Sequence, residues 1–141
     1  MRTPWHIWAV GILSLLWNAG GAFDYLMTQL QNEAYLGQLN EAQRAFLDAR
    51  PVWFDACWAL GVWGSILGSV LILLRSRFAA TAFGVSILGL LGSSIWSFFI
   101  ADPSAVEVNG TFGLVFSAAI VAILLALYTY SRTMSGKGHL R

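Results

Sequence analysis

Charged residues are scarce in this sequence. They make up 11% of its 141 residues, whereas soluble domains carry about 25%. Cysteine occurs once and histidine twice, so the chain can form neither an internal disulfide nor a metal site built from several cysteines. Hydrophobic residues, in contrast, make up 57% of the chain. These proportions exclude an ordinary soluble domain and indicate a protein that lies in a lipid bilayer.

Four long apolar runs follow one another along the chain, at 5–23, 52–74, 78–101 and 112–130. Each has the roughly 20 residues that a helix needs to cross a hydrocarbon core of about 30 Å. None shows the alternation of polar and apolar residues that is typical of β-barrel strands. The predicted fold class is therefore an all-α membrane protein, an antiparallel bundle of four transmembrane helices. We expect a single domain over 1–134 and a flexible cytoplasmic tail over 135–141.

Acidic and basic residues occupy opposite connections between these runs. Six of the eight bases lie in the tails and the middle connection: Arg2, Arg75, Arg77, Arg132, Lys137 and Arg141. All seven acids lie in or beside the first and third connections: Asp24, Glu33, Glu41, Asp48, Asp55, Asp102 and Glu107. Because cytoplasmic loops are rich in Lys and Arg, both termini are expected in the cytoplasm. The first and third connections are then expected on the opposite, outer side of the membrane.

The first helix is expected to project beyond the membrane surface. Leu26, Leu30 and Ala34 continue its four-residue apolar spacing as far as Gly37, which offers a stop. The segment between the first and second spans is therefore predicted to be partly helical.

The remaining connections predict one short helix and several turns. Asn40, three residues before Gln43, resembles a capping box and predicts a helix over 41–49. The connection at 75–77 is so short that the second and third spans must form a tight hairpin. In the third connection, the Asp-Pro pair at 102–103 and the Asn-Gly pair at 109–110 predict turns.

Small and polar residues mark the helix faces that point into the bundle. On the first span they are Gly11, Ser14, Asn18, Gly21 and Tyr25. An amide in hydrocarbon needs a partner, and for Asn18 we favour a hydrogen bond to another helix over contact with a ligand. Glycine or serine at four-residue spacing in the second and third spans, and alanine in the fourth (Ala118, Ala122 and Ala126), predicts close packing. Packing within one bundle is favoured over contact between subunits.

Two acids lie at the same end of neighbouring helices. Asp24 ends the first apolar run and Asp55 begins the second, so antiparallel pairing would place them at a similar depth. They could form a shallow acidic binding site, since ionisable groups in a span are functional candidates. Alternatively, Arg44 or Arg50 could pair with either acid and make a structural clasp.

Several of the seven tryptophans lie where aromatic belts form at the membrane surface, namely Trp5, Trp8, Trp53 and Trp96. Trp17 and Trp58 lie deeper, and Trp17 shares a helix face with Asp24. An aromatic wall beside a carboxylate suits a sugar or a cationic solute, although packing against glycine-rich helices is the commoner explanation. The candidate ligand-binding residues are therefore Asn18, Asp24, Asp55, Trp17 and Trp58.

Signatures of enzymes are missing. The sequence has no nucleophile elbow, phosphate loop or zinc motif. We therefore expect no enzyme activity, no catalytic residue, no metal, no cofactor and no nucleic-acid partner.

Three segments are similar to a family of small four-helix bacterial inner-membrane proteins of unassigned function, sometimes labelled sugar transporter. They are LLWNAGGAFDYLMTQ at 15–29, NEAYLGQL at 32–39 and RPVWFDACWALGVWGSILGSVLILLRSR at 50–77. Together they cover about half of the chain. The resemblance implies a multi-pass protein of the bacterial inner membrane, with the first and third connections in the periplasm and some connection to transport. It implies no particular binding residues.

Two functions remain open from the sequence. The first is a transporter or channel for a small polar, sugar-like solute, acting as a homo-oligomer because four helices enclose little volume. The second is a non-catalytic accessory or assembly subunit of a larger membrane complex, with segment 27–51 docking on the other membrane subunits. The lipid bilayer is the expected surrounding in both cases.

Overall fold

The computed structural model describes residues 4–101 and 105–141. Its helices, in chain order, are α1 (Trp5–Gln29), α2 (Glu33–Leu36), α3 (Glu41–Asp48), α4 (Val52–Leu73), α5 (Ala79–Ile95), the π-helical turn η1 (Trp96–Ile100) and α6 (Ala105–Gly136). No strand occurs in this described part of the chain. The fold is therefore all-α, as the composition predicts.

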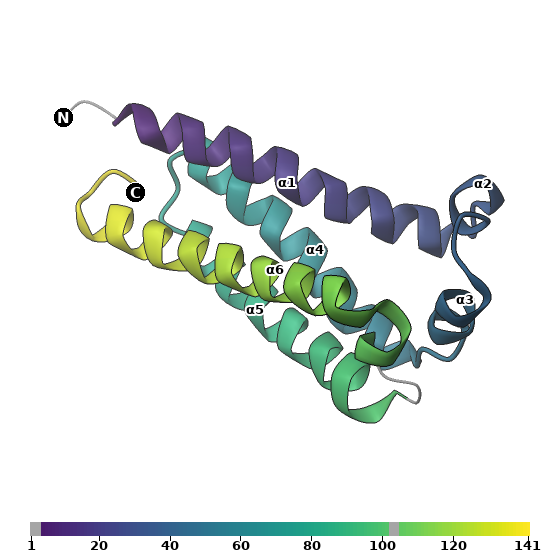
Figure 1. The fold of residues 1–141 in the computed structure, drawn as a ribbon. Helices are drawn as coiled ribbons and strands as arrows, with labels where there is room; N and C mark the ends of the chain where they lie inside the picture. The colour runs from purple at the N-terminus through teal and green to yellow at the C-terminus, as the bar shows by residue number, and fades with distance from the viewer. Residues whose placement is uncertain (1–3, 102–104) are drawn as a thin grey trace.

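Four segments are long and apolar enough to cross a membrane: Trp5–Gln29, Val52–Leu73, Ala79–Ile100 and Gly110–Gly136. They run side by side, with the two termini at one end of the bundle and α2 and α3 at the other (Figure 1). We call these the termini end and the α2–α3 end. Many large apolar side chains, such as Leu13 and Phe112, are exposed, as lipid-facing surfaces require. The predicted four-helix, membrane-type bundle is confirmed.

The first helix is shorter than the apolar spacing predicts. α1 ends well before Gly37, because Gln31 takes up a left-handed backbone conformation with φ 53° that ends a helix. Asn32 then begins α2 by accepting a hydrogen bond from the Tyr35 backbone N–H at 3.0 Å. The prediction of one continuous helix to Gly37 is wrong. The break turns α2 back, so that the Tyr35 hydroxyl reaches Asp24 on α1.

The other connections follow the sequence more closely. The capping box at Asn40 and Gln43 is present and begins α3. Residues 74–78 join α4 and α5 in the expected hairpin. The turn predicted at 102–103 lies outside the described residues. Gly110, with φ 69°, interrupts the helical backbone of α6, so the span-forming part of α6 begins there.

Glycine lets α4 and α5 approach closely along what we call the α4–α5 seam. A Cβ on Gly89 would lie 2.5 Å from the backbone oxygen of Cys57 and 2.6 Å from the backbone nitrogen of Gly61. A Cβ on Gly68 would lie 2.7 Å from the ring of Phe83. Only glycine permits such distances, and close approach is how helices associate in lipid. The predicted packing through small residues is confirmed for this pair.

The small residues of α6 are not used in the same way. Ala118, Ala122 and Ala126 are exposed, and α6 is the least buried of the four spans. This alanine stripe therefore faces away from the bundle, contrary to the expectation that it packs within one chain.

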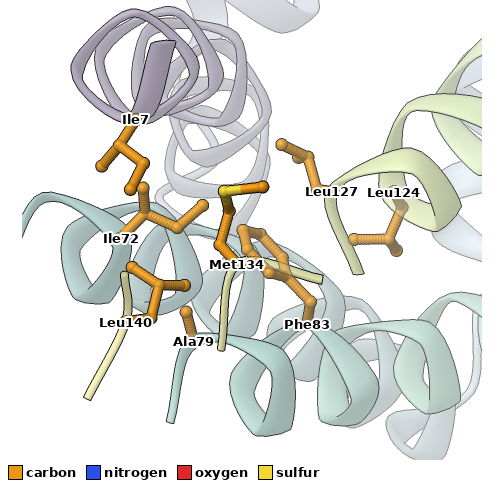
Figure 2. Close-up of a cluster of buried hydrophobic side chains, with 8 residues drawn as sticks. All are labelled: Ile7, Ile72, Ala79, Phe83, Leu124, Leu127, Met134 and Leu140. Atoms are coloured by element: carbon orange, nitrogen blue, oxygen red, sulfur yellow. The ribbon is translucent and has the colours of Figure 1, made fainter. Parts of the chain in front are cut away.

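The termini end of the bundle is filled by a buried cluster, which Figure 2 shows: Ile7, Ile72, Ala79, Phe83, Leu124, Leu127, Met134 and Leu140. We call it the core cluster. Leu140 comes from segment 135–141, for which the sequence predicts a flexible tail. Here the backbone N–H of Arg141 donates to the carbonyl oxygen of Arg75 at 2.8 Å. The segment thus packs back on the α4–α5 hairpin and completes the cluster.

Trp96 has a different place from the one that the sequence predicts. It is 5% exposed and therefore lies inside the fold rather than in a surface aromatic belt. Its ring centroid lies 4.7 Å from that of Phe54 and 5.0 Å from that of Phe46. Phe46 of α3 packs against Trp96 and covers it. The position of Trp96 at the end of a span does not predict this contact.

Candidate functional site

A cavity of about 660 Å³ lies among α1, α4, α5 and α6. Most of its lining is apolar. The polar side chains that reach it are Asn18, Asp24, Tyr35, Ser65, Ser86 and Ser93. The lining residues Leu16, Trp17 and Phe116 are exposed, so the cavity opens on the face between α1 and α6. We call it the α1–α6 cavity.

Few side chains bridge the α1–α6 seam in front of this cavity. At the termini end, His6 Nδ1 lies 2.5 Å from the hydroxyl of Tyr130. Further along, the rings of Trp17 and Phe116 lie 6.0 Å apart between centroids, with their planes tilted by 46°. Between the helices the space stays open, whereas Leu124 and Leu127 of the core cluster close it toward the termini end.

A hydrogen-bond network forms the polar wall of the cavity and ties three helices together. The side-chain amide of Asn18 donates to the backbone oxygen of Ser65 at 3.1 Å and to Ser69 Oγ at 2.9 Å. Ser65 and Ser86 hydroxyls lie 2.7 Å apart, and Ser14 and Ser69 hydroxyls lie 2.8 Å apart. Asn18 thus makes the predicted bond to another helix and also lines the cavity. Each hydrogen bond between helices contributes about 0.6 kcal/mol to the stability of a membrane protein.

Asp24 and Tyr35 border the cavity at the α2–α3 end. The Tyr35 hydroxyl donates a hydrogen bond to the Asp24 carboxylate, and its ring packs edge-to-face on Phe23 at 5.7 Å. Burial, followed by the hydrogen bond and the negative charge of Asp24, raises the pKa of Tyr35 from 10 to about 12. The hydroxyl therefore stays protonated and remains a donor at neutral pH.

A second, smaller cavity of about 240 Å³ adjoins the first beneath α2 and α3. Asp24, Tyr35 and Trp58 line both cavities. These three side chains therefore lie at the boundary between the α1–α6 cavity and the smaller cavity. Phe46 and Phe54 form much of the apolar wall of the smaller cavity.

The two acids singled out in the sequence have different surroundings. Asp55 accepts from Arg50 Nε at 2.7 Å and does not line the α1–α6 cavity. Asp24 lines it and bonds the neutral Tyr35 hydroxyl. The predicted clasp thus exists between Arg50 and Asp55, whereas Asp24 belongs to the cavity.

Aromatic side chains stand beside Asp24 in the cavity. Trp17 and Trp58 both line it, as the sequence suggests. Trp58 is braced by Tyr25, whose ring meets it edge-to-face at 5.0 Å between centroids. Of the five candidate binding residues, the structure brings four to one cavity: Asn18, Asp24, Trp17 and Trp58.

Sequence reasoning missed Tyr35, Ser86 and Phe116 as parts of the site. Tyr35 reaches Asp24 only because the chain reverses at Gln31, and the Asn32 cap was the one local signal of that reversal. Ser86 and Phe116 belong to helices far away in the sequence, so nothing local connects them to Asn18. No group of three or more His, Cys, Asp or Glu side chains suited to a metal occurs among the described residues.

Comparison with known proteins gives no match: no family model, no curated protein and no solved structure is similar to this chain. The resemblance drawn from the three sequence segments therefore stays a prediction.

Proposed function

We propose that this chain is an integral membrane protein that carries a small solute and binds it in the α1–α6 cavity. The observation behind the proposal is the cavity itself. Its volume of about 660 Å³ falls in the range of roughly 300–1,000 Å³ that small-molecule sites have. A mostly apolar lining with a few convergent polar groups is also typical of such sites.

A carrier fits this geometry better than a channel does. The core cluster fills the bundle at the termini end, so the described residues close the cavity in that direction. Carriers bind at a site that is open to one side and then move one group of helices against another. The α1–α6 seam, bridged by the pairs His6–Tyr130 and Trp17–Phe116, is the place where such a movement meets least resistance.

The location and assembly of the protein are part of the same proposal. The distribution of bases supports an inner-membrane protein with cytoplasmic termini, which would place the Asp24 and Tyr35 end of the cavity on the periplasmic side. The exposed stripe of Ala118, Ala122 and Ala126 supports a homo-oligomer, because small residues let helices of two subunits approach closely. Extraction in mild detergent followed by native mass measurement tests this part, since stable foreign subunits would favour an accessory role.

Ligand-induced thermal stabilisation, followed by flux, tests the carrier proposal. The purified protein is screened against sugars, organic cations and organic anions, because a bound ligand raises the unfolding temperature. Leucine at Gly21 would fill the cavity, and its Cβ meets nothing within 4 Å. Gly136→Leu is the matched control, since Gly136 also has open space and lies at the other end of the bundle.

We expect stabilising compounds to lose their effect in Gly21→Leu and keep it in Gly136→Leu. The same compounds should cross liposomes that contain the wild-type protein or Gly136→Leu, and not liposomes with Gly21→Leu. Equal stabilisation of both variants by these compounds would contradict a solute site in this cavity, and so would a flux that is unchanged in Gly21→Leu.

A further inference from the structure

The charge in and around the α1–α6 cavity is of one sign. Among the described residues that line it, Asp24 is the single Asp, Glu, Lys, Arg or His, and the smaller adjoining cavity adds none. Two other acids at this end have cationic partners, since Asp55 pairs with Arg50 at 2.7 Å and Glu33 with Arg44 at 3.2 Å. In the described part of the chain, Asp24 bonds only the neutral hydroxyl of Tyr35. Among these described residues, its negative charge has no counter-charge at the edge of an apolar space.

The hydrogen-bond donors of the lining are already committed. The amide hydrogens of Asn18 go to Ser65 and Ser69. The hydroxyls of Ser65 and Ser86 lie 2.7 Å from each other and each 2.6 Å from the backbone oxygen of Gly61, so their two protons are used among these three oxygens. Ser93 donates to the backbone oxygen of Leu90 and Tyr35 to Asp24. Apart from the two indole N–H groups, the polar side chains therefore offer a ligand acceptors rather than donors.

This pattern selects among ligand classes. A sugar needs several convergent donors and acceptors, and the serine hydroxyls that could serve it are used within the bundle. An anion would meet the Asp24 carboxylate with no base beside it. A metal cation needs about six oxygen ligands, which the lining does not supply. An organic cation matches both the unpaired carboxylate and the aromatic side chains of Trp17 and Trp58, since cations bind over indole faces.

We propose that the α1–α6 cavity binds a monovalent organic cation with an apolar body, a claim that rests on the proposed function. The positive group lies beside Asp24, near Trp17 and Trp58. The apolar body extends along Ile120 and Ile123 toward the closed end at Leu127. Such a ligand can enter from the lipid through the open face between α1 and α6, because its apolar body favours hydrocarbon.

Two probes of the same shape and opposite charge test this inference. Tetraphenylphosphonium and tetraphenylborate are titrated separately into the purified full-length protein in detergent micelles, with protein-free micelles as the blank. We expect the protein to bind the cation at least tenfold more tightly than the anion. A ratio of one or less in the wild-type protein overturns the inference without any variant.

Asp24→Asn removes the proposed counter-charge. Because Asp24 is exposed and its charge is partly screened, we expect a loss of about fivefold to tenfold in affinity for the cation and little change for the anion. Asp55→Asn is the matched control, because Asp55 lies at the same end and outside the cavity, and it should leave both affinities unchanged. Asp24→Glu keeps the charge and should keep the preference, so it tests the inference if Asp24→Asn does not fold.

The outcomes separate this inference from the proposed function. If both probes bind equally and Gly21→Leu abolishes both, the cavity binds solutes without selecting charge, which overturns the inference and supports the proposed function. If Asp24→Asn and Asp55→Asn weaken the cation equally, the effect is one of overall charge and the inference fails. If neither probe binds, the cation inference fails, and the compound screen decides the proposed function independently.

Discussion

The α4–α5 seam and the α1–α6 seam are built in opposite ways. Along the first, glycines such as Gly68 and Gly89 bring two helices so close that a single Cβ would collide with the partner. Along the second, large rings such as Trp17 and Phe116 meet at 6.0 Å and leave a cavity of about 660 Å³ behind them. Helices in lipid gain nothing from burying apolar surface against each other, so residue size decides which pairs close. The bundle therefore has a closely packed seam between α4 and α5 and a loosely packed seam, with a cavity behind it, between α1 and α6.

The largest expected effect comes from adding a methyl group in the α4–α5 seam, where glycine lets the two helices approach closely. Gly89→Ala places a Cβ against the backbone of Cys57 and Gly61, which cannot move aside without separating the helices. We expect a loss of about 2 kcal/mol in the free energy of unfolding, measured by denaturation in mixed micelles. Gly84→Ala on the same helix is the control, because its Cβ would meet Tyr128 at an ordinary 3.5 Å. Equal losses for the two variants would show that the seam is not tight.

A pair of buried serines tests the polar wall. Ser86 and Ser131 are both 0% exposed, but Ser86 is hydrogen-bonded to Ser65 and Gly61, whereas Ser131 Oγ has no partner among the described residues. We expect Ser86→Ala to lower the free energy of unfolding by about 1 kcal/mol. Ser131→Ala should leave it unchanged or raise it. The same unfolding experiment measures both, and the reverse order would refute the network.

The α1–α6 seam should tolerate the truncation of a side chain. Trp17→Ala removes one of the ring contacts across the α1–α6 seam, with Phe116, and no part of the α4–α5 seam. We expect the free energy of unfolding to change by less than about 0.5 kcal/mol, as for surface positions. A loss as large as that of Gly89→Ala would mean that the two seams do not differ, and the comparison would fail.

The smallest effect is local, at the α2–α3 end. The pKa of Tyr35 is raised to about 12, so the folded state favours the protonated hydroxyl. The stability that comes from the burial of the Tyr35 hydroxyl and its hydrogen bond to Asp24 is fully present below pH 10 and is lost as the pH rises through about 12. The tyrosinate absorbance difference between wild type and Tyr35→Phe should therefore have its midpoint near pH 12. A midpoint near 10 would show that in solution Tyr35 is neither buried nor hydrogen-bonded to Asp24 as in this structure.

Much of the fold was predictable because its signals are local. Span length, the capping box at Asn40 and the short hairpin connection are each read within a few residues. The end of α1 was not, since apolar spacing continues past Gln31 and one left-handed backbone angle overrides it. The site was half predictable: Asn18 and Asp24 are polar residues in or near a span, whereas Ser86 and Phe116 enter only through the arrangement of distant helices.

The most direct test of the account measures water access from each side of the membrane. In a Cys57→Ala background, which removes the sole cysteine, single cysteines replace Gly21 in the cavity or Met134 in the core cluster. We expect a charged, membrane-impermeant thiol reagent to modify Gly21→Cys from the α2–α3 side of sealed vesicles only, and to leave Met134→Cys unmodified from either side. An unreactive Gly21→Cys, or equal reaction at both positions, would contradict a cavity that is closed toward the termini end and that water reaches from the α2–α3 side.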